Sequence, residues 1–364
     1  MKNTFGNNVS VTLFGESHGA AIGAVLDGLP AGIPVSEDFI RHQLSLRRPV
    51  GKISTPRQEA DNFKILSGVW NGYTTGTALT IVIENTNTRS SDYESDERAA
   101  RPGHADYTAH CKYNGYEDYR GGGHFSGRIT AALVAAGAIV IDALKAKGIT
   151  IGTHISHIHG VRDRDFDDVE ADILSLAEKE FAVLDDGAAE SMKKEITDAA
   201  AEGDSVGGVL ESAICGIPVG VGEPWFDSLE SVLSHILFSI PGIKGVEFGA
   251  GFGIADLYGS QANDSFYYRD GKIKTKSNNN GGINGGITNS MPVLFRCAVK
   301  PTPTISKPQG TILLSSNLHT MLASRGRHDP CIVHRARVVV DSAAAIAVCD
   351  MLLAKLGADW LSEN

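Results

Sequence analysis

RGGGHFSGRITAALVAAGAIVIDALKAKG, residues 120–148, is the stretch that most constrains the fold of this chain. From Ser126 to Lys147 it is rich in alanine, a strong helix former, and Gly148 is placed to cap the C-terminus. We therefore predict a long helix from Ser126 to Lys147. The glycines just before it leave backbone N–H groups free at the positive end of the helix dipole, which favours an anion site. The segment is not a P-loop, because Arg128 and Ile129 stand where that motif needs Lys-Ser/Thr.

Shorter patterns on both sides of this helix predict a mixed fold. Residues 9–14 alternate like a strand, and Ser36 followed by two acidic residues begins a helix that ends before Pro49. Further strands are predicted at 77–84, 208–215 and 293–299. The Asp227-x-x-Glu230 spacing predicts a capped helix, and Asp341 begins a final helix that runs to Gly357. The mixture predicts an α/β (α+β) layered sandwich with sheets inside and helices outside.

No change in composition marks a domain boundary, so residues 1–364 are expected to form a single domain, although that is long for one core. The most polar stretch, about 162–204, carries apolar residues at near-helical spacing among its charges. It predicts a peripheral helical excursion.

Composition excludes several classes of partner. A net charge of -10 and a pI near 5.6 argue against nucleic acid and anionic membranes. The longest nearly apolar run, Ile129 to Ile141, is shorter than the ~20 residues that span a bilayer, and residues 1–8 have no apolar signal core. Five scattered cysteines, an odd number without Cys-x-x-Cys, indicate a reduced protein. We expect a cytoplasmic protein that neither enters nor binds membranes.

Basic residues are nonetheless concentrated between Ile40 and Gln58, where no acidic residue occurs. The cluster consists of Arg41, Arg47, Arg48, Lys52 and Arg57. A local cationic cluster in an acidic protein favours a small anionic ligand, and a solvated basic face is the alternative.

Three short segments, 14–19, 101–106 and 326–330, each crowd an imidazole, a carboxylate and glycine into six residues or fewer. Imidazoles exchange protons near pH 7, and glycine lets a ligand approach the backbone closely. The pattern favours a catalytic cleft, and a surface turn remains the alternative for each segment alone.

Two other patterns have weaker meanings. The glycine-rich residues 278–287 precede a strand that ends at Lys300. A flat ligand could lie on the glycines with its phosphate on the lysine, and the alternative is that the segment is a surface hairpin.

His154, His157 and His159 suggest a metal site, but in a strand His154 would point away from the other two and no cysteine or carboxylate is near in sequence. We predict no metal. Residues 249–254 lack the last glycine of the dinucleotide fingerprint.

The order and spelling of 14–19, 101–106 and 326–330 resemble the chorismate synthase family, and the resemblance runs from about Thr4 to Leu356. It implies the fold of that family and an anti-1,4 elimination of phosphate from 5-enolpyruvylshikimate 3-phosphate. The reaction gives chorismate, the last common precursor of the aromatic amino acids in the shikimate pathway. It requires reduced FMN without net redox change, so NADPH or another external reductant, an external flavin reductase and a homotetramer are also implied.

The resemblance assigns roles to residues by position. The histidine matching His18 protonates the departing phosphate, and the one matching His104 keeps the reduced flavin in its active protonation state. Ser17 and Asp329 match residues that relay a proton through flavin N5. The implied substrate contacts are Arg47, Arg48, Arg57, Arg128 and Arg327, and the implied NADP contacts are Arg47 and Lys52. The implied FMN contacts are His124, Phe125, Ser126, Pro241, Gly242, Gly285, Lys300, Pro301, Thr302, Pro303, Thr304 and Arg327.

The chain departs from the family in residues 120–130. Most members read Arg-Gly-Gly-Gly-Arg-Ser-Ser-Ala-Arg-Glu-Thr, whereas this chain has His124, Phe125, Gly127 and Ile129. An arginine and a glutamate lost together are either a compensated pair or a sign of weaker FMN binding. Two rival functions follow: a non-catalytic flavin or phosphometabolite binder, and a metal-dependent phosphoester hydrolase that uses His154 to His159.

Overall fold

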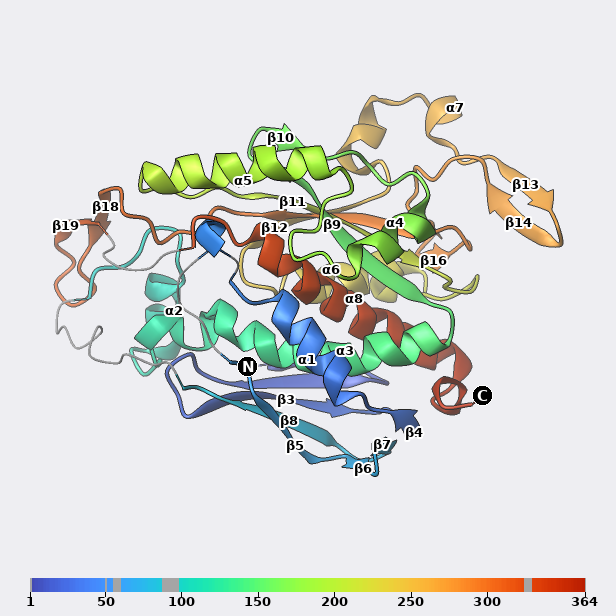
Figure 1. The fold of residues 1–364 in the computed structure, drawn as a ribbon, viewed down its shortest axis with the longest axis horizontal. Coiled ribbons are helices and arrows are strands. Elements are labelled where there is room, and N and C mark those ends of the chain that lie inside the picture. The colour runs from blue at the N-terminus through green and yellow to red at the C-terminus, as the bar shows by residue number, and fades with distance from the viewer. Residues whose placement is uncertain (1, 50, 55–59, 87–97, 324–328, 364) are drawn as a thin grey trace.

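The computed structural model describes residues 2–49, 51–54, 60–86, 98–323 and 329–363, without the side chain of Lys52. Two five-stranded antiparallel sheets account for most of its strands (Figure 1). The first has the order β1 (Thr4–Phe5), β2 (Ser10–Gly15), β3 (Ala21–Asp27), β8 (Leu79–Glu84), β5 (Phe63–Ser67). The second has the order β10 (Val161–Arg162), β9 (Thr150–Ile158), β11 (Gly208–Cys215), β17 (Val293–Val299), β12 (Ile243–Phe248).

Helices form the layer between these sheets. In Figure 1, α1 (Glu37–Leu46), α3 (Thr130–Ala146) and α8 (Val333–Leu356) run above the first sheet and below the second. Helix α3 packs on β2, β3, β8 and β9, and α8 packs on α3, α6 (Leu229–Leu237), β9 and β11. The α+β class is therefore confirmed, but the expected layer order is wrong, because the main helices lie inside and the sheets outside.

Small side chains explain this inverted order. A helix that is apolar all round must be buried, and nearly every residue of α8 and the first two-thirds of α3 are buried. At their crossing, a Cβ added to Gly137 would lie 2.3 Å from Cβ of Ser342, so no larger residue fits there. In the ranges that the structure describes, 127–146 is the one helix long and apolar enough to cross a bilayer, and 72% of that window is buried inside the protein.

Several local predictions are confirmed. Strands β11 and β17 have the predicted bounds, and β17 alternates buried and half-buried residues, as expected for a strand with one face on the helical layer. The Ser36 hydroxyl accepts a hydrogen bond from Phe39 N at 3.1 Å and caps α1. The Ser126 hydroxyl caps the short 3₁₀ turn 127–129 that leads into α3.

Two helix starts differ from the prediction. Ser228 rather than Asp227 caps α6, by accepting from Ser231 N at 3.1 Å. The final helix begins at Val333, and Asp341 is buried in its interior, where Thr153 of β9 donates to its carboxylate at 2.5 Å. An acidic residue before an apolar run was thus mistaken for a cap.

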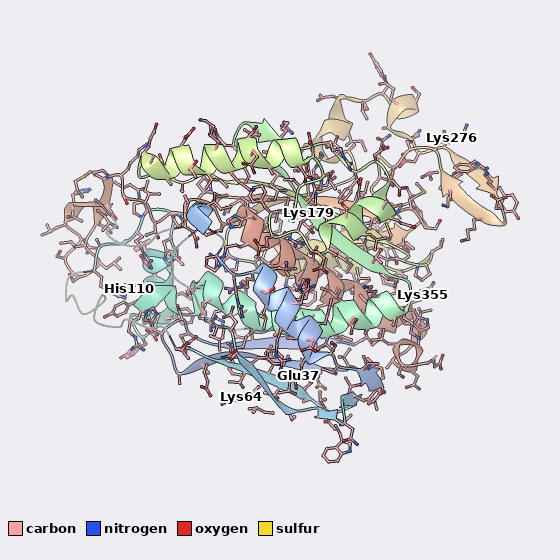
Figure 2. All side chains as sticks on the ribbon, viewed as in Figure 1. Glu37, Lys64, His110, Lys179, Lys276 and Lys355 are labelled. Carbon is pink, nitrogen blue, oxygen red and sulfur yellow. The ribbon has the colours of Figure 1, made fainter. Side chains whose placement is uncertain are left out.

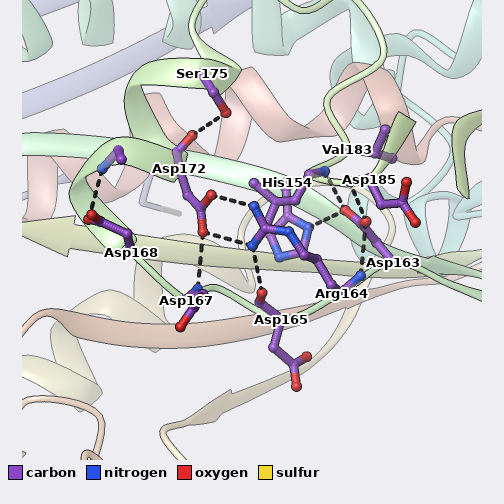
Figure 3. A network of polar contacts seen from close by, with 12 residues as sticks. His154, Asp163, Arg164, Asp165, Asp167, Asp168, Asp172, Ser175, Val183 and Asp185 are labelled. Carbon is purple, nitrogen blue, oxygen red and sulfur yellow. Dashed lines mark hydrogen bonds and ion pairs between the residues drawn. The ribbon is translucent and has the colours of Figure 1, made fainter. Parts of the chain in front are cut away.

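The polar stretch 162–204 contains α4 (Val169–Leu176) and α5 (Asp186–Ala201), which cover the outer side of the second sheet (Figure 1). A charged network attaches them to the sheet (Figure 3). Buried His154 of β9 bonds to Asp163 and to Glu211 of β11, each at 2.9 Å. Asp163 also accepts from the backbone of Leu184 at 2.6 Å.

The remaining elements lie at the periphery. A three-stranded sheet has the order β4 (Ala31–Pro34), β7 (Tyr73–Thr75), β6 (Val69–Trp70). Hairpins pair β13 (Phe266–Arg269) with β14 (Lys272–Thr275), β15 (Ile283–Asn284) with β16 (Ile287–Thr288), and β18 (Gln309–Ile312) with β19 (His319–Leu322). The short helices α2 (Asp106–Tyr113) and α7 (Gly259–Ala262) lie at opposite ends of the view in Figure 1.

Candidate active site

The glycine-rich segment between α2 and α3 is the centre of the candidate site. Gly121 and Gly122 have φ of 60° and 87°, a left-handed backbone that favours glycine. A Cβ added to Gly121 would lie 2.2 Å from Nδ1 of His18, and one added to Gly122 would lie 3.3 Å from Nε2 of His104. Adjacent glycines therefore face the two predicted catalytic histidines, which come from distant parts of the sequence.

Strand β2 delivers Ser17 and His18 to this loop. The strand ends at Gly15, whose carbonyl accepts a hydrogen bond from Nδ1 of His124 at 2.8 Å, and Ser17 N donates to the Gly123 carbonyl at 3.1 Å. Ser17 and His18 are 1% and 8% exposed. Two backbone contacts thus fix the end of β2 against the glycine loop.

His104 is held by its own turn. Nδ1 of His104 lies 2.7 Å from Oδ1 of Asp106, and the Arg101 guanidinium forms a bidentate pair with the same carboxylate at 2.7 Å. Burial alone would raise the pKa of Asp106, but the hydrogen bonds from Arg101 and His104 outweigh it and hold that pKa far below its ordinary value.

The end of β17 lies beside this turn. The Lys300 ammonium donates to the Gly103 carbonyl, and Lys300 N donates to the Gly242 carbonyl at 2.9 Å. Pro303 lies 3.4 Å from where a Cβ of Gly103 would be. The structure therefore brings the predicted FMN contacts 241–242 and 300–304 next to His104.

Two of the implied substrate contacts, Arg47 and Arg128, lie in a buried group of charges. Arg47 and Arg128 are buried, and both pair with the carboxylate of Asp61, Arg47 at 3.5 Å. Arg47 also donates to the Gly127 carbonyl at 2.6 Å and to the Thr130 hydroxyl at 2.9 Å. Burial lowers the pKa of Arg47 to about 10. Both guanidiniums are buried in this structure.

Asp329 and Arg48 lie on the same side of the site as Arg47. Arg335, in the first turn of α8, pairs with Asp329 at 2.6 Å and donates to the Arg47 carbonyl at 2.9 Å. Arg48 is exposed, and its guanidinium donates to the Ala60 carbonyl at 2.6 Å. Arg57, Arg327 and the side chain of Lys52 lie outside the described residues.

Of the remaining predicted FMN contacts, Phe125 lies in the glycine-rich loop and Gly285 lies apart from the others. Phe125 is 37% exposed and packs edge-on against Tyr113, with ring centroids 6.2 Å apart. Gly285 lies in the turn of the β15–β16 hairpin, and this hairpin is near Lys355. The Thr288 carbonyl of β16 accepts a hydrogen bond from Gly220 N, and a Cβ added to Gly220 would lie 2.7 Å from the Lys355 ammonium. Lys355 is in the last turn of α8, far from His110 of α2 in Figure 2, whereas Asp329 pairs with its first turn.

Sequence reasoning gave no role to two carboxylates that hold the site together, although it counted Asp106 in the segment 101–106. Asp61 follows the acid-free basic cluster closely in the chain, so its sequence position was a usable signal. Asp106, two residues after His104, was another. Asn85, which accepts from Nε of Arg128 at 3.0 Å and donates to the Glu16 and Gly19 carbonyls, gave no such signal.

The histidines of β9 do not form a metal site among the described residues. Both ring nitrogens of His154 are taken by carboxylates, and His159 lies beyond the strand with φ of 48°, so the expected alternation of faces does not reach it. A cavity of about 450 Å³ between α5 and the start of α8 contains none of the predicted site residues. Lysines at its edge, Lys179 and Lys193, already pair with neighbouring carboxylates.

Comparisons with known proteins identify the family of this chain. The sequence pattern of the family described as chorismate synthase matches residues 9–353. A chorismate synthase of Thermococcus kodakarensis is 45% identical over 96% of this chain and 97% of its own length, and one of Chitinophaga pinensis is 43% identical over the full length of both. A solved structure titled as that of a chorismate synthase superposes with a TM-score of 0.77 at 32% identity, covering 97% of this chain and 94% of its own. The chain belongs to the chorismate synthase family.

Proposed function

We propose that the residues around the 120–130 loop catalyse the anti-1,4 elimination of phosphate from 5-enolpyruvylshikimate 3-phosphate, which yields chorismate. Membership of the family makes the chain a carbon–oxygen lyase that acts in aromatic amino-acid biosynthesis. The observation that carries the assignment of the site is the convergence of His18 and His104 on adjacent glycines. Binding alone does not need two buried or half-buried imidazoles on one loop, and this favours catalysis over the rival flavin-binding function.

His18 and Ser17 have different tasks in this proposal. His18 protonates the departing phosphate, a task suited to an imidazole near neutral pH. The glycine at 121 lets His18 sit against the loop with no side chain between them. Ser17 and Asp329 relay the proton that leaves the substrate, and Arg335 holds the Asp329 carboxylate at 2.6 Å.

Reduced flavin is the cofactor of the family, and we propose that this chain binds it as FMN. When bound, it supplies electron density to the reacting ring and recovers it, so the reaction has no net redox change. Two features fit such a group. The Thr302 hydroxyl is buried without a hydrogen-bond partner among the described residues, so a bound group could supply one. A Cβ added to exposed Gly127 would meet nothing within 4 Å, so there is open space beside this part of the loop. Residues 241–242, 300–304 and His124 to Ser126 would hold it, with the Lys300 ammonium beside its phosphate.

The substrate carries two carboxylates and a phosphate, which require positive charge. Exposed Arg48 is the described arginine best placed for direct contact. Buried Arg47 and Arg128 share the carboxylate of Asp61 beneath the site. Arg57 and Arg327 remain proposed contacts, as does Lys52 for NADPH.

We also propose a cytoplasmic homo-oligomer, a tetramer by analogy with the family, that receives reduced flavin from an external reductase. The position of Gly285 supports the oligomer. An α-helix rises 1.5 Å per residue, so the 24 residues of α8 separate its two ends by about 36 Å. One FMN molecule cannot reach Gly285 and the surroundings of Asp329 in the same chain, and a second copy would have to supply Gly285.

The experiment is an anaerobic assay for chorismate with dithionite-reduced FMN. Relative to wild type, His18→Ala and His104→Ala should lower kcat by about 10²–10⁴-fold while FMN affinity changes little. His159→Ala is the matched control, because the His159 side chain is exposed and bonds only to Glu195 among the described contacts. Wild-type protein that binds FMN but makes no chorismate would support the flavin-binding rival instead.

A further inference from the structure

Asp106 carries a carboxylate whose hydrogen bonds all come from one turn. Its Oδ1 receives Nη2 of Arg101 and Nδ1 of His104, each at 2.7 Å, and its Oδ2 receives Nε of Arg101 at 2.7 Å and the Arg101 backbone N–H at 3.0 Å. Although Asp106 is the first residue of α2, it does not cap that helix, which has no side-chain cap. The carboxylate therefore serves the turn and the imidazole.

The Arg101 fork keeps this carboxylate ionised, so it only accepts hydrogen bonds. An ionised acceptor at Nδ1 requires that Nδ1 carry a proton in every state of the ring. Neutral His104 must then be the Nδ1–H tautomer, and only Nε2 can gain or lose a proton. The Nε2 edge faces Gly122, 3.3 Å from where a side chain would begin.

We propose that Asp106 is a positioning residue. It fixes His104 as the Nδ1–H tautomer and directs the exchangeable proton, on Nε2, toward Gly122 of the glycine-rich loop. The inference rests on the proposed function, in which His104 keeps bound reduced flavin in its active protonation state. Orientation of an imidazole by a carboxylate is an established device in enzymes, where the carboxylate sets the tautomer and does not itself take the proton. Other charged or titratable groups facing the turn are the Lys300 ammonium, bound to the Gly103 carbonyl, and His18 across the glycine loop.

Asp106→Asn tests the proposal, because asparagine keeps the size and removes one acceptor. The backbone N–H and the Nε–H of Arg101 both donate to Oδ2, so they would hold the amide oxygen at that position. The amide NH₂ would then take the Oδ1 position, where it faces His104 and can donate to Nδ1. The proton of neutral His104 would move to Nε2. Ring ¹⁵N resonances of His104, assigned by their loss in His104→Ala, should report this change in the full-length protein without flavin or substrate.

The kinetic expectation is equally specific. Asp106→Asn should lower kcat by about 10²–10⁴-fold, up to the whole effect of removing His104, with FMN affinity within about twofold of wild type. In the His104→Ala background the same substitution should have no further effect, because a positioning residue has nothing left to position.

Asp172→Asn is the matched control. Asp172 also accepts a bidentate arginine, Arg164 at 2.5 and 2.9 Å, and a backbone N–H, but it lies in the α4 excursion (Figure 3). It should leave kcat and the His104 resonances unchanged. An unchanged tautomer in Asp106→Asn, or an additive loss of kcat in the double variant, overturns the proposal. Absence of chorismate from the wild type would refute the proposed function while leaving the tautomer result intact.

Discussion

Gly121→Ala should remove most of the activity through a steric effect on His18. The Cβ of alanine would lie 2.2 Å from Nδ1 and from Cε1 of His18 and 2.9 Å from Oγ of Ser17, whereas ordinary contacts begin near 3.4 Å. His18 would have to move by about 1.2 Å, and a displacement of that size in a catalytic group can cost about 10²-fold in rate. The loop cannot relieve the overlap easily, because Ser17 N is bonded to the Gly123 carbonyl at 3.1 Å.

Backbone strain is a separate effect and needs its own control. Gly121 has φ of 60°, where a residue with a side chain is less stable by about 1–2 kcal/mol. Gly148, which follows α3, has φ of 74° and nothing within 4 Å of an added Cβ. Gly148→Ala should therefore lose similar stability in urea unfolding but retain full kcat. The reasoning would be refuted if Gly121→Ala matched Gly148→Ala in kcat under anaerobic conditions with reduced FMN.

Three further predictions concern the buried charges and the reductant. Asp61→Asn should lower the free energy of unfolding by about 3–5 kcal/mol, because it leaves two buried arginines without their shared carboxylate, whereas exposed Asp38→Asn should change urea unfolding very little. Burial opposes protonation of His154, but bonds to its two carboxylates raise its pKa above the ordinary 6.5, so its stabilisation should be complete below pH 6.5 and lost as the pH rises through the raised value. Wild type and His154→Gln should then converge in stability at alkaline pH, and a difference that grows with pH would contradict this assignment. Activity should require dithionite or a separate reductase, and turnover in air with NADPH and oxidised FMN alone would show an intrinsic reductase.

Local structure could be read from the sequence where one physical signal dominated. Strands β11 and β17 and the Ser36 cap followed from alternation and hydrogen-bonding capacity, which act within a few residues. The layer order did not, because alanine-rich helices look alike whether they cover a sheet or lie between two. The space left by Gly137 and Ser342 at the α3–α8 crossing decides the order, and this contact joins distant parts of the chain.

The candidate site was predictable in its residue types but not in its charge pairing. The short sequence motifs pointed to His18 and His104, and the fold places both side chains against the same glycine-rich loop. The pairing of Arg47 and Arg128 with Asp61 could not be predicted, because three separate segments of the chain meet there. An acid-free window in sequence is therefore weak support for exposed positive charge.

The substituted residues of the 120–130 loop have partners of their own. His124 donates to the Gly15 carbonyl at 2.8 Å, a bond that ties the loop to the end of β2. Ile129 is 5% exposed within the hydrophobic core, where a carboxylate would have to be buried at a cost and an isoleucine is not. Neither position leaves an unmatched charge in this chain. A loop held at one end by the hydrogen bond from the His124 side chain to the Gly15 carbonyl, and at the other by apolar packing, does not need an arginine–glutamate pair to keep Gly121 and Gly122 against the two histidines. This favours the interpretation of the paired loss as a compensated change.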